Sequence, residues 1–307
     1  MNLTNIATLK RLCKELNIWP SKKLGQNFLI NNNILDKIIK AGGLSAQDNV
    51  IEIGPGFGVL TMELLKYIKN LIIIEKDKKL AEFLEKEIDG RIKIIINDIL
   101  KISNFQFPIF KQIPNSKFQI LNYKIISNLP YQITSPVLWK FLHYEEKHKP
   151  ETMVLMVQKE VAERIIAKPG KMSVLSVMCQ FYADCELISL VSRENFWPEP
   201  DVDSAIIKLK LQAPSSNNQK NTKHQTPNIK IFNTKYFFKL VKIGFSAKRK
   251  MLKNNLSAGL QIPSQDIEKI LQDIKLNKKI RAQELSVKDW VELYREIKEI
   301  EKREKRL

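Results

Sequence analysis

The chain has 307 residues, of which 44% are hydrophobic and 27% charged, a composition typical of a globular protein rather than a disordered one. Its length favours one large domain with a smaller one, or two of medium size. Lys and Arg number 51 against 33 Asp and Glu, so the formal net charge is +18. This excess favours a polyanionic partner, either nucleic acid or an anionic membrane surface, although a lysine-rich genome would give the same composition.

The cysteines and histidines give no sign of a metal site. Cys13, Cys179 and Cys185 are odd in number and lack metal-ligand spacing, and no histidine clusters with them. The first residues mix charged with apolar side chains, so they contain no apolar signal core, and no later segment is long and apolar enough to span a membrane. We therefore expect a cytoplasmic protein without a metal, a disulfide framework or a membrane partner.

Short β-rich runs alternate with helical patterns between residues 34 and 211. This alternation predicts β-α-β units and a parallel sheet covered on both faces. The predicted strands are 49–53, 71–74, 92–96, 123–127, 152–157, 183–191 and 204–211, and the predicted helices include 60–68 and 80–88. The last two strands flank a proline-containing loop, so they are expected to form a hairpin at the sheet edge.

A polar stretch over residues 212–233 predicts a linker between two domains. Helical patterns follow over residues 236–260, 264–274 and 286–300. The sequence therefore predicts a larger domain over residues 1–211 and a smaller, all-helical one over residues 234–307. The helical domain includes the basic runs 248–250 and 302–306.

The most informative segment is the glycine-rich loop at residues 52–58, Glu-Ile-Gly-Pro-Gly-Phe-Gly, which joins a predicted strand to a predicted helix. Closely spaced glycines let a ligand approach the main chain. A dinucleotide fingerprint has the spacing G-x-G-x-x-G, whereas this loop has G-x-G-x-G, and Pro55 removes one N–H donor. A phosphate cradle is therefore the weaker interpretation.

Acidic residues follow the next two predicted strands. Glu75 ends the second strand, where a carboxylate can accept hydrogen bonds from both ribose hydroxyls, and Asp98 follows the third, where it can accept from an adenine amino group. A lone acid at a strand end is usually a solvated turn or a helix cap. Acids at successive strand ends behind a glycine loop instead suit a nucleoside without phosphates. S-adenosylmethionine is such a ligand, and its sulfonium tolerates nearby carboxylates, so we predict it as the cofactor.

The segment Asn128-Leu129-Pro130-Tyr131, after the fourth strand, resembles the N-P-P-Y-like loop of amino-group methyltransferases. Adenine N6 is a poor nucleophile because its lone pair is delocalised into the ring. An enzyme that holds both amino hydrogens on acceptors favours the pyramidal, nucleophilic form. The side-chain oxygen of Asn128 and the main-chain oxygen of Leu129 or Pro130 can be these acceptors. Tyr131 offers the base a stacking face.

From about Lys23 to Tyr294, the chain resembles the small-subunit rRNA adenine dimethyltransferases of the KsgA type. Several separate motifs carry the resemblance, in the same order as in the family. They are L-G-Q-N-F-L at 24–29, Q-K-E-V-A-E-R at 158–164, F-W-P-E-P-D-V-D-S-A at 196–205, F-S-A-K-R-K at 245–250 and R-A-Q-E-L-S at 281–286.

The resemblance implies an α/β fold, in which a Rossmann-like class I S-adenosylmethionine-dependent methyltransferase domain precedes a smaller all-helical C-terminal domain. It implies dimethylation of N6 of two adjacent adenines in a hairpin loop near the 3′ end of 16S rRNA. The implied partner is small-subunit ribosomal RNA or an immature 30S-type particle. The basic helical domain would then be an rRNA-docking surface, and the protein is expected to be a monomer.

The resemblance also implies roles for single residues. The implied cofactor-binding residues are Asn27, Leu29, Gly54, Glu75, Asp98 and Asn128. Asn27 and Leu29 close over the cofactor, and Gly54 lies against its methionine part. The implied catalytic residues are Asn128, Leu129, Pro130, Tyr131 and Phe196, with Phe196 stacking on the flipped adenine opposite Tyr131.

Several positions near these motifs depart from the family pattern. Gln132-Ile133-Thr134 stands where Asn-Ile-Ser usually follows N-L-P-Y, and residues 169–174 lack the family's common S-K-x-Y-G-R pattern. Ser127 stands where a Gly usually precedes N-L-P-Y, and Glu199 stands where a Pro is usual. Asn128, Pro130, Tyr131 and Phe196 match the pattern, so the chemistry is expected to be the family's.

Two other functions are compatible with parts of the sequence. An Erm-type large-subunit rRNA adenine methyltransferase shares the catalytic domain, but such proteins typically carry an N-I-P-Y-like motif where this chain has Leu129. A non-catalytic, transcription-factor-like nucleic-acid-binding homologue is the second alternative. The intact Glu75, Asp98 and Asn128 argue against it.

Overall fold

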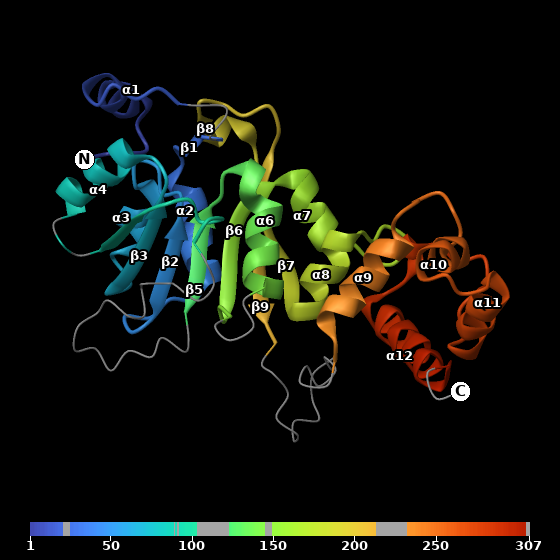
Figure 1. Cartoon of the computed structure of the whole chain (residues 1–307). Helices are drawn as coiled ribbons and strands as arrows, with labels where there is room; N and C mark the ends of the chain where they lie inside the picture. Colours follow the sequence, from blue (N-terminus) through green and yellow to red (C-terminus); the bar gives the residue numbers. More distant parts are fainter. Residues whose placement is uncertain are drawn as a thin grey trace. The chain divides into compact units, whose positions relative to one another are not determined.

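The computed structural model describes residues 1–20, 25–88, 90, 92–102, 123–144, 149–212 and 232–304. Contacts within the chain group it into two compact units (Figure 1). One comprises Met1–Ala162 with Asp184–Leu211, and the other Glu163–Ala183 with Gln212–Leu307.

Residues 163–183 therefore group with the helical unit, whereas the sequence assigned them to the first domain. The domain limits 1–211 and 234–307 stay a prediction. The predicted linker, residues 212–233, lies almost entirely outside the described residues.

A seven-stranded sheet forms the centre of the first unit, with the strand order β4-β3-β2-β5-β6-β9-β7 (Figure 1). The strands are β2 (Asn49–Ile53), β3 (Asn70–Glu75), β4 (Lys93–Ile96), β5 (Lys124–Asn128), β6 (Thr152–Gln158), β7 (Ala183–Val191) and β9 (Ser204–Leu211). Strands β4, β3, β2, β5 and β6 run parallel to one another, and β9 is antiparallel to β6. Each predicted strand is present to within one residue at either end, and β9 and β7 are neighbours at the edge as expected.

The central strands are apolar because helices cover both faces of the sheet. Residues 50–53 and 152–157 are buried without interruption, the pattern of a strand with no solvent-facing side. The covering helices of this unit include α2 (Asn32–Gly42), α3 (Val59–Leu64), α4 (Lys78–Ile88) and α6 (Thr134–Trp139), and α1 (Ile6–Glu15) precedes them. Apolar side chains of α2, α3 and α4, such as Ile38, Leu64 and Leu84, belong to one hydrophobic core.

The strand order reverses between β2 and β5. After β2 the chain builds β3 and β4 on one side, and then places β5 and β6 on the other. The paired register of β2 and β5 covers Val50↔Lys124 and Ile51↔Ile125, two residues short of the carboxyl end of β2. In open α/β sheets, ligands bind in the crevice that opens at such a switch point.

A two-stranded sheet joins two distant parts of the first unit. Strand β1 (Phe28–Leu29) pairs antiparallel with β8 (Phe196–Trp197), with Phe28 opposite Trp197 and Leu29 opposite Phe196. The side-chain amide of Asn31 donates to that of Asn195 at 2.7 Å. This pairing fixes the segment around residues 25–30.

The second unit is helical, as predicted. Its helices are α8 (Val174–Tyr182), α9 (Thr234–Gly244), α10 (Leu252–Leu260), α11 (Ser264–Asp273) and α12 (Val287–Glu304), and α7 (Lys159–Ile165) crosses from the first unit. Stacked aromatic rings form part of its core, including Phe181 against Phe237 with centroids 4.8 Å apart. Among the described residues, no helix is both long and apolar enough to cross a membrane.

The prediction of one helix over residues 236–260 is wrong. The helix ends at Gly244 and resumes at Leu252, and the basic run at residues 248–250 lies in the connection. The side-chain amide of Asn255 donates to the main-chain oxygens of Gly244 (2.6 Å) and Ala247 (3.1 Å), which replaces helix hydrogen bonds at the break. The apolar periodicity continues across the break, so it did not reveal the interruption.

Candidate active site

A cavity lies at the carboxyl ends of β2, β3, β4 and β5, at the switch point of the sheet. Its lining comprises residues 25–29, 52–56, 59–60, 74–77, 97–99 and 128–133. These segments contain every residue that the sequence predicted for the site except Phe196. The cavity therefore brings together the glycine loop, the two acids and the Asn128–Tyr131 segment.

The glycine loop needs its glycines for conformation and for space. Gly54 and Gly56 have φ angles of 67° and 61°, in the left-handed region that side chains disfavour. A β-carbon at Gly56 would lie 2.8 Å from the ring of Phe28. The main-chain N–H of Gly54 donates to the oxygen of Ile74 at 2.9 Å, which holds the loop against β3. The result is a rigid wall of exposed backbone along the cavity.

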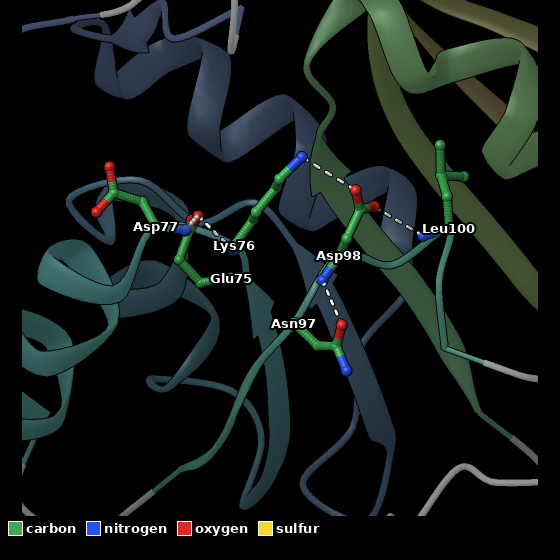
Figure 2. Close-up of polar contacts among 6 residues, drawn as sticks. All are labelled: Glu75, Lys76, Asp77, Asn97, Asp98 and Leu100. Atoms are coloured by element: carbon green, nitrogen blue, oxygen red, sulfur yellow. Dashed lines mark hydrogen bonds and ion pairs between the residues drawn. The ribbon is translucent and has the colours of Figure 1, made fainter.

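Glu75 sits at the end of β3 with its carboxylate held by main-chain donors. It accepts from the N–H groups of Lys76 (2.7 Å), Asp77 (2.8 Å) and Gly56 (3.4 Å). Its side chain is buried, and burial raises its pKa, although these three hydrogen bonds act in the opposite direction. Figure 2 shows Glu75 beside Lys76 and Asp77 at this strand end. The donors fix the orientation of the carboxylate towards a ligand.

Asp98 lies at the end of the neighbouring strand, linked to Lys76 across the cavity wall (Figure 2). The Lys76 ammonium contacts one carboxylate oxygen at 3.0 Å, and the Leu100 N–H donates to the other at 3.0 Å. Burial acts to raise the pKa of Asp98, but the hydrogen bonds from Leu100 and Lys76 outweigh it and lower the pKa. No sequence motif pointed to Lys76, although its position one residue after Glu75 was a signal.

Glu52 is a second residue of the cavity to which the sequence motifs gave no role. It lines the cavity from the end of β2, is 1% exposed, and accepts a hydrogen bond of 2.6 Å from the Thr61 hydroxyl. Burial raises the pKa of Glu52 to about 8 against this hydrogen bond, and the charge of Glu75 adds to the rise. An acid in an otherwise apolar strand was the signal that could have identified it.

The Asn128–Tyr131 segment leaves β5 and forms one side of the cavity. The Asn128 side-chain nitrogen donates to the main-chain oxygen of Asn27 at 3.3 Å, which directs the side-chain oxygen of Asn128 away from that contact. The Leu129 N–H donates to the Met156 oxygen at 3.2 Å. Pro130 packs against the glycine loop, since a β-carbon at Gly54 would lie 3.3 Å from it. Two segments of the predicted site, around residues 27 and 128, are thus in direct contact.

Phe196 is not among the residues that line the cavity. Its side chain is 3% exposed, belongs to the hydrophobic core, and its main chain pairs with Leu29. Its stacking on a target base stays a prediction. Glu199, in the same loop, forms an ion pair with Arg193 at 2.8 Å, which balances the negative charge that it introduces.

The chain matches a known protein family over most of its length. A family model described as ribosomal RNA adenine dimethylase matches residues 20–299. The chain belongs to the ribosomal RNA adenine dimethylase family. Membership confirms the predicted family, the predicted methyltransferase fold class and the predicted cofactor, S-adenosylmethionine.

Relatives from this family match nearly the whole chain. The chain is 39% identical over 290 residues to the ribosomal RNA small subunit methyltransferase A of Dehalococcoides mccartyi, with 94% of this chain and 92% of the relative covered. It is 35% identical over 285 residues to the protein of the same name from Clostridioides difficile, with 92% of each covered.

Two solved structures share the fold. A dimethyladenosine transferase from Plasmodium falciparum is 26% identical with a TM-score of 0.69, and the match covers 89% of this chain and 98% of that one. The 23S rRNA methyltransferase ErmE is 24% identical with a TM-score of 0.64, covering 88% of this chain and 98% of its own. The similarity to ErmE concerns the fold alone.

The burial of Glu52 predicts a specific dependence of stability on pH. A free glutamate titrates near 4.5, whereas Glu52 in the folded protein titrates near 8, so between these values the folded state binds more protons than the unfolded one. The contribution of Glu52 to the free energy of unfolding is therefore fully present below about pH 4.5, and it is lost as the pH rises through about 8. Its slope approaches about 1.4 kcal/mol per pH unit.

The measurement is the free energy of unfolding in urea, for wild-type and Glu52→Gln protein, at pH values spaced by about one unit between about 5 and 8. We expect the wild type to lose stability relative to Glu52→Gln as the pH rises, since Gln does not titrate. Glu82→Gln, which alters an exposed acid on α4, should follow the wild-type profile. Parallel profiles for the wild type and Glu52→Gln would contradict a protonated Glu52.

Proposed function

We propose that the protein uses S-adenosylmethionine to dimethylate N6 of two adjacent adenines in a hairpin loop near the 3′ end of 16S rRNA. One observation carries this proposal. A single cavity at the switch point is lined both by the acids Glu75 and Asp98, which suit a nucleoside, and by the Asn128–Tyr131 segment. An electrophilic methyl donor and an acceptor amine are thereby brought to the same place. The high net positive charge and the names of the relatives support rRNA as the substrate.

The cofactor residues have the chemistry that S-adenosylmethionine requires. The carboxylate of Glu75, held by main-chain donors, is suited to accept from the two ribose hydroxyls, and Asp98 is suited to the adenine amino group. Gly54 exposes main chain where the methionine part would lie, and Asn27 and Leu29 line the cavity beside it. The bound cofactor supplies the methyl group as a sulfonium electrophile, and the nearby carboxylates favour its positive charge.

The acceptor residues act on the exocyclic amine of the target base. The Asn128 side-chain oxygen accepts one amino hydrogen. The Pro130 oxygen already accepts from the Ile133 N–H at 3.1 Å, so the Leu129 oxygen is the better acceptor for the other hydrogen. Holding both hydrogens concentrates electron density on N6, and no general base with a shifted pKa is required. The Tyr131 ring provides the stacking face, and Phe196 is proposed to join it when RNA binds.

The helical unit, with the exposed basic run at residues 248–250, is suited to dock on rRNA phosphates. The particle recognised would be an immature 30S-type subunit, because flipping two adjacent adenines requires a shaped RNA substrate. The protein would act as a monomer in the cytoplasm, where ribosomal subunits assemble.

Asn128→Ala should lower the turnover number by about 100-fold or more, because it removes an acceptor that acts on the reacting amine. RNA affinity, measured by filter binding, should remain within about threefold of wild type because phosphate contacts dominate it. Asn33→Ala, an exposed asparagine at the start of α2, serves as the control and should retain full turnover. Wild-type turnover in Asn128→Ala would exclude the amino-group mechanism.

Glu75→Gln should weaken S-adenosylmethionine binding by about tenfold to 100-fold, since a neutral amide accepts hydrogen bonds more weakly than a carboxylate. Isothermal titration calorimetry measures this directly, and turnover at saturating cofactor should change less than the affinity does. Glu82→Gln, on the outer surface of α4, should bind like the wild type. Unchanged affinity in Glu75→Gln would place the ribose elsewhere.

The assignment of the RNA substrate is tested by mapping the methylated bases. The protein is incubated with labelled S-adenosylmethionine and, separately, immature small subunits and large-subunit RNA. We expect label in two adjacent adenines near the 3′ end of the small-subunit RNA only. Label confined to large-subunit RNA would favour the Erm-type function, and no label in either RNA would favour a non-catalytic binding protein.

A further inference from the structure

Ser127 makes a contact that the usual glycine at its position has no hydroxyl to make. It is 0% exposed, and its hydroxyl donates to the main-chain oxygen of Ile53 at 2.6 Å. The register of β2 and β5, extended from Ile51↔Ile125, would bring Ile53 opposite Ser127, but the paired register of these described strands ends before that level. The side chain thus links the two strands where their main chains separate.

The position of this hydrogen bond connects the two halves of the site. Ile53 directly precedes Gly54 of the glycine loop, and Ser127 directly precedes Asn128. The bond therefore holds the first residue of the acceptor segment at a fixed distance from the wall proposed to hold the methionine part of the cofactor.

The other end of the acceptor segment is held by a second serine. The Tyr131 hydroxyl and the Ser204 hydroxyl form a hydrogen bond of 2.6 Å. Ser204 is 0% exposed and begins β9, where it pairs with Gln158 at the end of β6. Burial raises the pKa of Tyr131, so the phenol keeps its proton at neutral pH and remains able to donate. The Tyr131 ring is thereby tied to the sheet.

The middle of the segment is fixed by its main chain. The Leu129 N–H donates to Met156 on β6, and Pro130 packs against the positions of Gly25 and Gly54. Among the contacts of the described residues, the side-chain hydroxyls that hold the segment are those of Ser127 at the start and Ser204 at the finish. Removing either hydroxyl would loosen one end without removing any group that touches cofactor or base in the proposed function.

We propose that Ser127 and Ser204 are positioning residues that hold the Asn128–Tyr131 segment in register with the glycine loop and so align the acceptor amine with the methyl donor. This inference rests on the proposed function. Small misalignments of reacting groups are costly, since a displacement of about 1 Å can slow a reaction by about 100-fold. The second methyl transfer is the more sensitive step, because the monomethylated amine has only one hydrogen left to hold and a methyl group to accommodate.

The test measures turnover, KM and the ratio of monomethylated to dimethylated adenine for Ser127→Ala, Ser204→Ala, Tyr131→Phe and the double variant Ser204→Ala/Tyr131→Phe. We expect each single variant to lower turnover by about tenfold, with KM for cofactor and RNA within about twofold, and to accumulate monomethylated product. The double variant should be no slower than the slower of its two single variants, because both remove the same hydrogen bond. Ser192→Ala removes an exposed hydroxyl from the loop before β8 and should match the wild type.

Wild-type turnover and product ratio in both serine variants would overturn the inference while leaving the proposed function intact. A loss of activity that follows a loss of cofactor affinity would also overturn it, because alignment acts on turnover. Tyr131→Phe removes the same hydrogen bond as Ser204→Ala but alters the partly buried partner, Tyr131. The inference therefore stays testable if a variant of a buried serine unfolds. Failure of the wild type to methylate small-subunit RNA would instead refute the proposed function.

Discussion

The site depends on the separation of β2 and β5 at their carboxyl ends. The strand order reverses between these two strands, and their paired register stops two residues short of the carboxyl end of β2. The glycine loop leaves β2 and the Asn128–Tyr131 segment leaves β5, so the two turn away from each other and a cavity opens between them. The acids Glu75 and Asp98 reach this cavity because Glu75 ends β3 and Asp98 follows the end of β4 on the same sheet.

Much of this arrangement follows from local features of the sequence. Alternating apolar runs predicted the strands because a parallel sheet buries both faces, and the glycine loop with the strand-end acids predicted a nucleoside site. Features that depend on contacts between distant parts of the chain could not be predicted from local patterns. The break after Gly244 is stabilised by Asn255, whose role periodicity does not encode, and residues 163–183 group with the helical unit through tertiary packing.

At the site, too, local motifs pointed to some residues, whereas the contacts of others depend on parts of the chain that are distant in sequence. Asn128, Glu75 and Asp98, which the motifs singled out, line the cavity, whereas Phe196 is enclosed in the core through the pairing of β1 with β8. The ion pair of Lys76 with Asp98 forms only when two strand ends meet, and the hydrogen bond from Thr61 to Glu52 forms only when the helix after β2 packs against that strand. Ser127 was visible in the sequence only as a departure from a pattern, and its hydrogen bond to Ile53 supplies a physical reason for a hydroxyl there.

The proposed function requires the switch-point cavity to hold the cofactor so that its reactive group faces the Asn128–Tyr131 segment. A crystal structure of the protein with S-adenosylhomocysteine would show whether it does. We expect ribose hydroxyls on the Glu75 carboxylate, the adenine amino group beside Asp98, and the sulfur directed towards Asn128. A nucleoside bound away from Glu75 and Asp98, or with its sulfur turned from Asn128, would exclude this arrangement.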